Sequence, residues 1–349
     1  MTPRVQEAFL QQATNCEALG SPFMADLMRL FAQRLTADMG SVAGRILNWP
    51  GDMSYTGDSV PLRIAGGLHA LAILERCGLH HCYPPNAFDP NMVWRAIEWA
   101  FQSEGPLLTS WLENAPQTNE IRRSAPLIAI GHWLTKRYGL PINMVEIGCS
   151  AGLNLMWDRF ALIIDGQTWG PEHSPVALMP DWNGVKPPPT QPKITGRIGI
   201  DLNPLDPASP IDTLALLAYL WPDQPHRSMT TKAAIQMALS DDLPPELVEA
   251  DAIAWIRSHL RLQDGEITLI YSTIAWQYLT KAAQEQGRSL IQSLGQSATR
   301  SHPLAWFQME ADGQSPGARL LLRLWPGDLR IDMGRADFHG RWVNWTPNI

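Results

Sequence analysis

The sequence is poor in cysteine, has no long apolar run and lacks a basic cluster. Its four cysteines are scattered through 349 residues, so we expect no disulfide framework, and a reducing compartment fits. The longest helical apolar block, residues 214–221, is far shorter than the roughly 18 residues that a spanning helix needs. The N-terminal stretch MTPRVQEAFLQQ lacks the apolar core of a signal peptide. These absences predict a cytoplasmic protein without a membrane partner.

Positive charge is also scarce. The chain has 27 Lys and Arg residues against 34 Asp and Glu residues, which gives a formal net charge of −7 at pH 7. Proteins that bind nucleic acid need clustered Lys and Arg to neutralise phosphates. The composition therefore argues against nucleic acid as a main partner.

The two parts of the chain differ in pattern. Up to residue 139, helical patterns recur without a convincing strand, and we predict helices at residues 5–19, 22–38, 62–77, 91–104 and in a segment ending near residue 138. In the second of these, Leu27, Leu30 and Phe31 share one face at helical spacing. From residue 140 onward strands alternate with helices, which is typical of a parallel sheet covered by helices. We therefore predict a helical region, residues 1–139, and an α/β domain, residues 140–349.

Seven strands are predicted in the α/β domain. The first five lie at residues 144–147, 198–202, 247–249, 267–273 and 304–309. The last two flank WPGD, residues 325–328, which has Pro and Gly where a type II turn requires them. Residues 161–193 are predicted to be an insertion, either a hairpin or a lid. Five βα units closed by an antiparallel hairpin resemble the Rossmann-like sheet of the class I S-adenosylmethionine-dependent methyltransferases.

The segment NMVEIGCSAGLNLMWD, residues 143–158, joins the first strand to a helix through small residues. It resembles the first motif of that superfamily, with Glu146, Gly148 and Gly152 in place and Ser150 where the middle glycine usually stands. Small residues let a ligand lie against the backbone, and amides at a helix N-terminus face it. Asn154 could hydrogen-bond the amino-acid portion of the cofactor. The segment matches neither G-x-G-x-x-G nor a P-loop.

Two further acids follow predicted strands. The resemblance implies that Asp201 accepts hydrogen bonds from the ribose hydroxyls and that Asp251, followed by Ala252, lies at the adenine. Strand carboxyl ends are where ligands bind in open α/β sheets. A competing assignment makes ALIID the second strand and Asp165 the ribose acid, although we prefer Asp201. Each acid could instead cap a helix or turn.

In that superfamily the end of the fourth strand faces the transferring methyl group. Tyr271 could orient an acceptor or act as an acid or base, although a partly buried tyrosine with one hydrogen bond is the simpler explanation. Ser272 is a candidate cofactor contact. His339, in DFHGRW, is a candidate general base or a turn residue. Methyl transfer depends mainly on positioning, with help in proton removal for oxygen and nitrogen acceptors.

Polar residues concentrate just before the first strand, in APQTNEIRRSA. Gln117, Asn119, Arg122 and Arg123 suit a carboxylate or phosphate on the substrate, because a guanidinium binds such groups in bidentate fashion. Helix capping by Thr118 or Asn119, with solvated arginines beyond, is the alternative. The expected substrate is a small molecule, and an anionic one would suit these side chains.

Other chemistries fit less well. CGLHHC, residues 77–82, does not have a standard zinc-finger spacing, and four ligands within six residues would strain a tetrahedral site, so we expect no metal. GCSAG formally matches the G-x-S-x-G elbow of α/β-hydrolases with Ser150 at its centre. An esterase is therefore one rival function, and a non-catalytic nucleoside-binding protein is another.

The whole chain also resembles a bacterial family of unknown function. Its marks are APQTNEIRRSA, EIGCSAGLNLMWDRF, GIDLNPLD and a late pattern, WPGD followed by HG.W. The resemblance implies a methyltransferase-like fold with a helical N-terminal region, and it gives no reaction. Together these patterns predict a methyltransferase that uses S-adenosylmethionine as cofactor and acts on a small molecule. They leave its oligomeric state open.

Overall fold

The computed structural model describes residues 2–348 and divides the chain into two compact units. The helical unit contains Met1–Thr118 and Ser209–Met229, and the sheet unit contains Asn119–Ala208 and Thr230–Ile349. This division differs from the predicted one at residues 139 and 140. Helix α7 (Ser124–Tyr138) packs against a short helix of the sheet unit, η4 (Leu153–Arg159). Residues 209–229 leave the sheet unit because they carry α8 (Pro210–Ala218), which packs on helix α4 of the helical unit.

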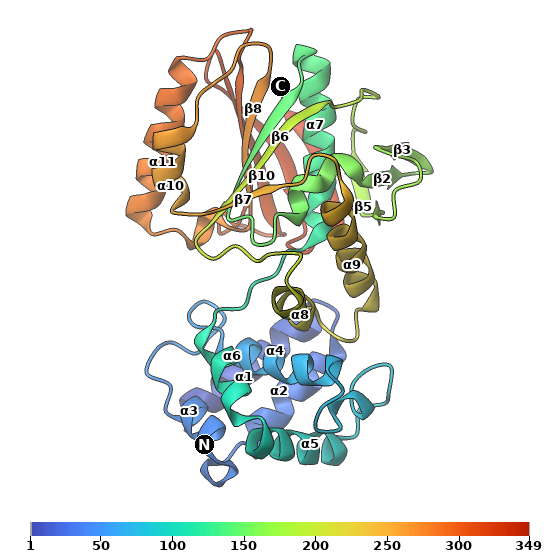
Figure 1. Cartoon of the computed structure of the whole chain (residues 1–349), viewed down its shortest axis with the longest axis vertical. Helices are drawn as coiled ribbons and strands as arrows, with labels where there is room; N and C mark the ends of the chain where they lie inside the picture. The colour runs from blue at the N-terminus through green and yellow to red at the C-terminus, as the bar shows by residue number, and fades with distance from the viewer. Residues whose placement is uncertain (1, 349) are drawn as a thin grey trace. The chain divides into compact units, whose positions relative to one another are not determined.

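The helical unit is built from short helices (Figure 1). Helix α1 packs on α2, where Phe9 and Phe31 stack with ring centroids 5.1 Å apart. Prolines in the first turn start several helices, because their missing N–H has no helical partner there. Besides α8, the helices of this unit are α1 Pro3–Ala18, α2 Pro22–Arg34, α3 Ser41–Leu47, α4 Val60–Ile73, α5 Pro90–Ser103 and α6 Gly105–Glu113. Helix α9, Pro225–Ser240, begins in this unit and ends in the sheet unit.

The sheet unit contains a nine-stranded sheet in the order β5-β12-β11-β10-β9-β8-β1-β6-β7. Its strands are β1 Ile142–Ile147, β6 Ile194–Asp201, β7 Glu246–Glu249, β8 Ile267–Thr273, β9 Leu304–Glu310, β10 Ala318–Trp325, β11 Leu329–Ala336, β12 Trp342–Asn348 and β5 Asp181–Gly184. The five strands from β7 to β9 are parallel, and β10 and β11 form the predicted antiparallel hairpin. The prediction of seven strands is wrong, because β12 and β5 extend the sheet beyond the hairpin.

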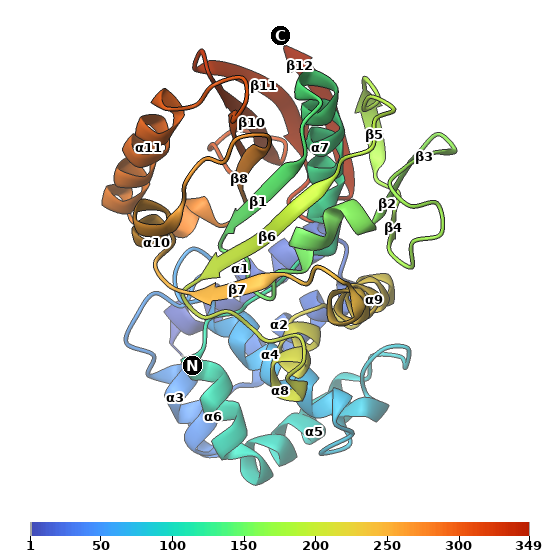
Figure 2. The same cartoon turned by 45° about the horizontal axis from the view of Figure 1, so that its top comes forward.

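Helices cover both faces of the parallel strands, which explains why β1 and β8 are almost entirely buried. Val145, Ile147 and Ile270 pack against α10 (Ala252–His259) and α11 (Lys281–Gln296) on one face. Helix α7 lies on the other side of the sheet (Figures 1 and 2). Within residues 2–348, no helix has the length and apolar character needed to cross a membrane.

The first part of the predicted insertion, residues 161–178, forms a small sheet in the order β3-β2-β4, whereas β5, which also lies within the predicted insertion, joins the large sheet. Strand β2 (Ala161–Ile164) and β3 (Gln167–Trp169) make a hairpin, and β4 (Ala177–Leu178) pairs with β2. Asp165 lies in the turn of this hairpin and pairs with Lys186. It therefore does not end a strand of the large sheet, and the competing assignment for the ribose acid is wrong.

The turn between β10 and β11 has the positive φ angle that its prediction requires. Gly327, the third residue of WPGD, has a φ of 103°. A type II turn needs a positive φ at this position. The Pro-Gly pattern therefore placed the hairpin correctly, and the turn type stays a prediction.

Candidate functional site

The loop after β1 lies where the chain order of the sheet reverses. From β1 the chain continues to β6 and β7 on one side, and later to β8 and β9 on the other. In open α/β sheets, ligands bind outside the strand carboxyl ends at this point. Gly148, Ser150 and Gly152 have positive φ angles of 72°, 52° and 67°. A positive φ is uncommon for serine, so this loop has a strongly constrained backbone.

Asp201, at the end of β6, holds this loop. Its Oδ2 accepts a hydrogen bond from the Ser150 N–H at 2.9 Å, and its Oδ1 accepts one from the Asn203 N–H at 3.0 Å. The carboxylate is half-buried. Asp201 therefore lies next to the motif loop, as predicted, and it also supports the unusual backbone of Ser150.

The two glycines of the loop make room for protein groups. A Cβ added to Gly148 would lie 2.5 Å from the Cβ of Ala275, in the segment after β8. A Cβ added to Gly152 would lie 2.5 Å from Cδ2 of Leu247, in β7. Ala275 and Leu247 of the protein therefore lie where a side chain on these two positions would go, and binding of a ligand at the glycines stays a prediction. Gly148 still has an exposed backbone.

The two polar motifs of the sequence contact each other. Asn119 Oδ1 accepts a hydrogen bond from the Leu153 N–H at 2.9 Å, and the Ser124 hydroxyl donates to Asn154 Oδ1 at 2.8 Å. Both asparagines are buried. Asn119 therefore bonds the Leu153 N–H, an amide at the helix N-terminus that was expected to face a ligand. The side-chain oxygens of both asparagines bond protein groups and not a ligand. The alternative that Asn119 caps the local helix is also wrong, because Glu120 caps η3 (Ile121–Arg123) and Asn119 bonds the Leu153 N–H at the start of η4.

The two predicted substrate arginines are also held by protein groups. Arg123 donates from Nε to the carbonyl oxygen of Phe338 at 2.9 Å and from a terminal nitrogen to that of Thr273 at 3.3 Å. Arg122 pairs with the buried carboxylate of Glu120 at 3.0 Å. Arg123 thereby joins the end of β8 to the β11–β12 turn, a structural role in place of the predicted one. Gln117 belongs to the helical unit.

Glu146 and Tyr271 lie in the interior beneath the loop. They are 1% and 0% exposed, and the Tyr271 hydroxyl lies 3.5 Å from Glu146 Oε2 and 3.4 Å from the Asn154 carbonyl oxygen. Burial, with the nearby charge of Asp201, raises the pKa of Glu146 well above its usual range. Burial likewise raises the pKa of Tyr271. Both side chains contact protein groups in the interior, and the role of Tyr271 as an acid or base stays a prediction.

The other predicted residues make structural contacts of their own. Asp251 is exposed and caps α10 by accepting from the Ala254 N–H at 2.8 Å, which is the capping alternative. Ala252 packs in the core under α10, and Ser272 is fully buried in β8. His339 lies in the β11–β12 turn, where its N–H donates to Asp337 Oδ1 at 3.0 Å.

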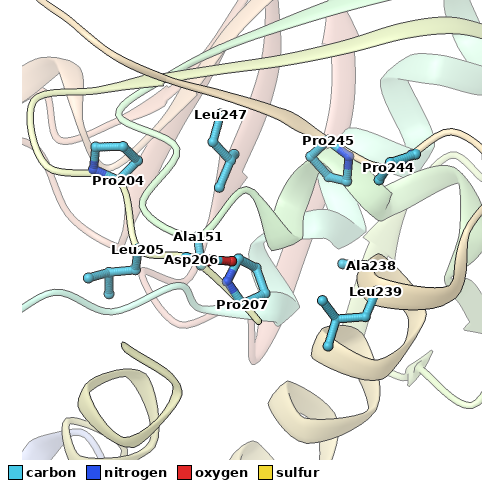
Figure 3. A pocket seen from close by; sticks show the side chains of 10 residues that line it. All are labelled: Ala151, Pro204, Leu205, Asp206, Pro207, Ala238, Leu239, Pro244, Pro245 and Leu247. Carbon is cyan, nitrogen blue, oxygen red and sulfur yellow. The ribbon is translucent and has the colours of Figure 1, made fainter. Parts of the chain in front are cut away.

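A cavity of about 450 Å³ adjoins the motif loop within the sheet unit (Figure 3). Its lining residues are Ala151, Pro204, Leu205, Asp206, Pro207, Ala238, Leu239, Pro244, Pro245 and Leu247. Sequence reasoning missed all of them. The signal that could have found them is the pair of proline-rich stretches, NPLDP after β6 and PP before β7, which keep small apolar rings at the sheet edge.

Comparison with known families completes the description. Within residues 2–348, no group of three or more His, Cys, Asp or Glu side chains could hold a metal ion. No curated protein matches the chain in sequence. A family model described as "Uncharacterized protein conserved in bacteria (DUF2332)" matches residues 6–345, which confirms the predicted relationship. The chain therefore belongs to this bacterial family.

Proposed function

We propose that the sheet unit is an S-adenosylmethionine-dependent methyltransferase acting on a small molecule. One observation carries the proposal. Numbered along the chain, the five parallel strands have the order 3-2-1-4-5, which is the order of doubly wound nucleotide-binding sheets. The constrained Gly148–Gly152 loop follows strand 1, at the switch point where such sheets bind their ligands.

Three features of the loop suit an adenosyl ligand. The Ser150 hydroxyl is buried without a hydrogen-bond partner among the described residues, and a buried polar group is stable only when it is paired. Asp201 presents a carboxylate with lone pairs left for hydroxyl donors. Leu202, the next residue, is 69% exposed and offers apolar surface beside that carboxylate. Ser150, Asp201 and Leu202 would hold the cofactor.

The cofactor supplies an electrophilic methyl group, and the protein's own residues act by positioning. Asp201 fixes the Ser150 backbone, so the same carboxylate that would bind the ligand also shapes the loop. Glu146 lies below the loop, and its burial together with the nearby charge of Asp201 raises its pKa. The arginines before β1 are held by Glu120 and by backbone carbonyls. We therefore do not assign these arginines to an anionic group on the substrate.

The experiment is calorimetric titration with S-adenosylmethionine and S-adenosylhomocysteine. Asp201→Asn keeps an oxygen for the Ser150 amide and removes the charge. It should weaken binding roughly 10- to 100-fold, because hydrogen bonds to a charged group contribute about 1.5–3 kcal/mol. Asp165→Asn is the matched control, since Asp165 lies in the β2–β3 turn. Absence of saturable binding of either compound would overturn the proposal.

One observation favours esterase activity as a second candidate. Ser150 stands at the centre of GCSAG and has a positive φ of 52°, as expected for a strained nucleophile elbow. Its hydroxyl has no partner among the described residues, so no histidine there activates it. Hydrolysis of p-nitrophenyl acetate that disappears in Ser150→Ala would establish the esterase and exclude the methyltransferase assignment of this loop.

A further inference from the structure

The segment after β8, residues 274–279, flanks the switch point of the sheet together with the motif loop. In the sheet, β1 lies between β6 and β8 (Figure 2). The chain runs first from β1 to β6 and β7, and it crosses to β8 only later. Open α/β sheets bind their ligands beyond the carboxyl ends of the two strands at which the chain order reverses. Here these strands are β1 and β8, so residues 274–279 form the second loop at this position.

This segment has a constrained backbone. Ile274 has a positive φ of 55°, which is a genuine outlier for a β-branched residue. Its N–H donates to the Met309 carbonyl oxygen at 2.8 Å, and the Glu310 carboxylate accepts from the next three amides. The Gln284 side chain, in α11, donates to two carbonyl oxygens of the segment at 3.2 and 3.1 Å. Strain of this kind persists only where the surroundings enforce it, and it is concentrated at active sites and ligand sites.

The segment also lies against the motif loop. A Cβ on Gly148 would be 2.5 Å from the Cβ of Ala275. The Tyr278 N–H donates to the Ala275 carbonyl oxygen at 3.1 Å, which closes the short helix η5 (Trp276–Tyr278) back onto this contact. Tyr278 is therefore one helical turn away from the loop that we assign to the cofactor.

Tyr278 presents an aromatic ring at this position. It is 75% exposed, whereas Trp276 is 4% exposed and packs in the core. None of residues 274–279 is charged, and Gln277 is held by a hydrogen bond that its side-chain oxygen accepts from the Ala311 N–H at 3.0 Å. A planar neutral ring suits this surface, because aromatic rings stack on one another and the segment has no carboxylate to attract a cation.

We propose that Tyr278 binds the methyl acceptor by stacking and that the acceptor carries a planar aromatic ring. The inference rests on the proposed function, because it places the acceptor beside the cofactor loop. It adds the class of substrate and the residue that selects it. Tyr278 acts through the face of its ring, so phenylalanine should replace it and leucine should not.

Two matched probes test the ring preference. Calorimetry on the full chain saturated with S-adenosylhomocysteine would compare 2-naphthol with decahydro-2-naphthol, which share a hydroxyl group and a bicyclic outline and differ in planarity. We expect 2-naphthol to bind saturably at millimolar concentration. It should bind roughly threefold to tenfold more tightly than the saturated probe, in line with the contribution of one aromatic pair. This preference should disappear in Tyr278→Leu and remain in Tyr278→Phe.

Control measurements separate the ring preference from general effects and from the cofactor. Tyr55→Leu removes a tyrosine of the helical unit that is 56% exposed, and it should leave the preference unchanged. The affinity for S-adenosylhomocysteine should also be unchanged in all three variants, because Tyr278 is assigned to the acceptor alone.

Four outcomes would overturn the inference: equal affinity of the wild type for the two probes, no binding of 2-naphthol, a preference that survives in Tyr278→Leu, or weaker S-adenosylhomocysteine binding in that variant. Failure of the wild type to bind S-adenosylhomocysteine would instead overturn the proposed function. The two failures are therefore distinguishable in one set of titrations.

Discussion

Asn119 Oδ1 accepts a hydrogen bond from the backbone N–H of Leu153 at 2.9 Å, across 34 residues of sequence. This bond joins the QTNE segment to the SAGLNL segment, and Ser124 reinforces it through Asn154. Two of the motifs by which the sequence resembles its family are therefore two halves of one contact. Their joint occurrence reflects a requirement of the fold at the loop after β1.

Replacing Asn119 with alanine should destabilise the sheet unit by about 1–3 kcal/mol, because the buried Leu153 N–H would lose its acceptor. Urea denaturation would measure the loss. Asn183→Ala, on the exposed strand β5, should change stability by less than about 0.5 kcal/mol. Equal stability of the two variants would show that the Asn119 bond does not matter.

The Glu310 carboxylate at the end of β9 fixes the segment that packs against Gly148. It accepts from the N–H groups of Ala275, Trp276 and Gln277 at 3.2, 3.0 and 3.4 Å. Burial raises its pKa, and these hydrogen bonds together with one from Ser272 oppose the shift. Glu310→Ala would leave several amides unpaired. We expect a loss of at least about 2 kcal/mol in urea denaturation.

Glu310→Gln should lose less stability than Glu310→Ala, because one oxygen acceptor remains. Hydrogen exchange would locate the effect, with faster exchange confined to the amides of residues 275–277 in the glutamine variant. Uniformly faster exchange across the sheet would contradict the assignment of Glu310 to this segment.

Acid should weaken the sheet unit through His132. Burial lowers the pKa of His132 from 6.5 to about 4, so the folded state binds fewer protons than the unfolded state between these values. Its contribution is therefore fully present above pH 6.5 and is lost as the pH falls toward 4. At pH 5 the loss amounts to about 2 kcal/mol.

Calorimetric unfolding of the wild type and of His132→Gln at pH 7 and pH 5 would measure the contribution of His132 to the loss of stability. The wild type should lose more stability on acidification than the variant. His69, in the helical unit, has its pKa lowered to about 4 by burial as well, so the difference between the two proteins is the relevant quantity. An identical pH response would rule out His132 as the source.

Substituting alanine for each of two helical glycines should change the stability of the protein in opposite directions. A Cβ on Gly131, in α7, would lie 2.1 Å from the Trp157 ring, whereas one on Gly44, in α3, has no neighbour within 4 Å. Gly131→Ala should therefore cost about 1–3 kcal/mol through overpacking. Gly44→Ala should be neutral or stabilising by up to about 1 kcal/mol. Thermal denaturation of both variants would decide, and a stabilised Gly131→Ala would contradict the packing of α7 on η4.

The sequence predicted most of the parallel strands well, because β1 and β8 are continuous buried runs with clear ends. Strands β5 and β12 escaped prediction. Their pairing joins Asp181 to Trp342 across the chain, and a short edge strand such as β5 carries little local signal. Sequence also could not show which face of β1 Glu146 occupies, so an interior acid looked like a ligand contact.

The candidate site was harder to predict than the fold. The motif loop and Asp201 were placed correctly, since strand ends and small residues mark such positions. The side chains of Asn119, Asn154 and Arg123 form hydrogen bonds with protein groups from distant segments, and no local sequence pattern reveals such contacts. The cavity walls likewise come together only in three dimensions.

The assignment of Ser209–Met229 to the helical unit governs how the protein can be dissected. The chain passes between the units after residues 118, 208 and 229, so no single cut separates them. A fragment starting at Asn119 would carry α8 without its partners and would expose Leu216 and Leu217, which are buried in the intact chain. Isolating a well-behaved sheet unit therefore requires excising residues 209–229 and bridging the gap with a short flexible linker.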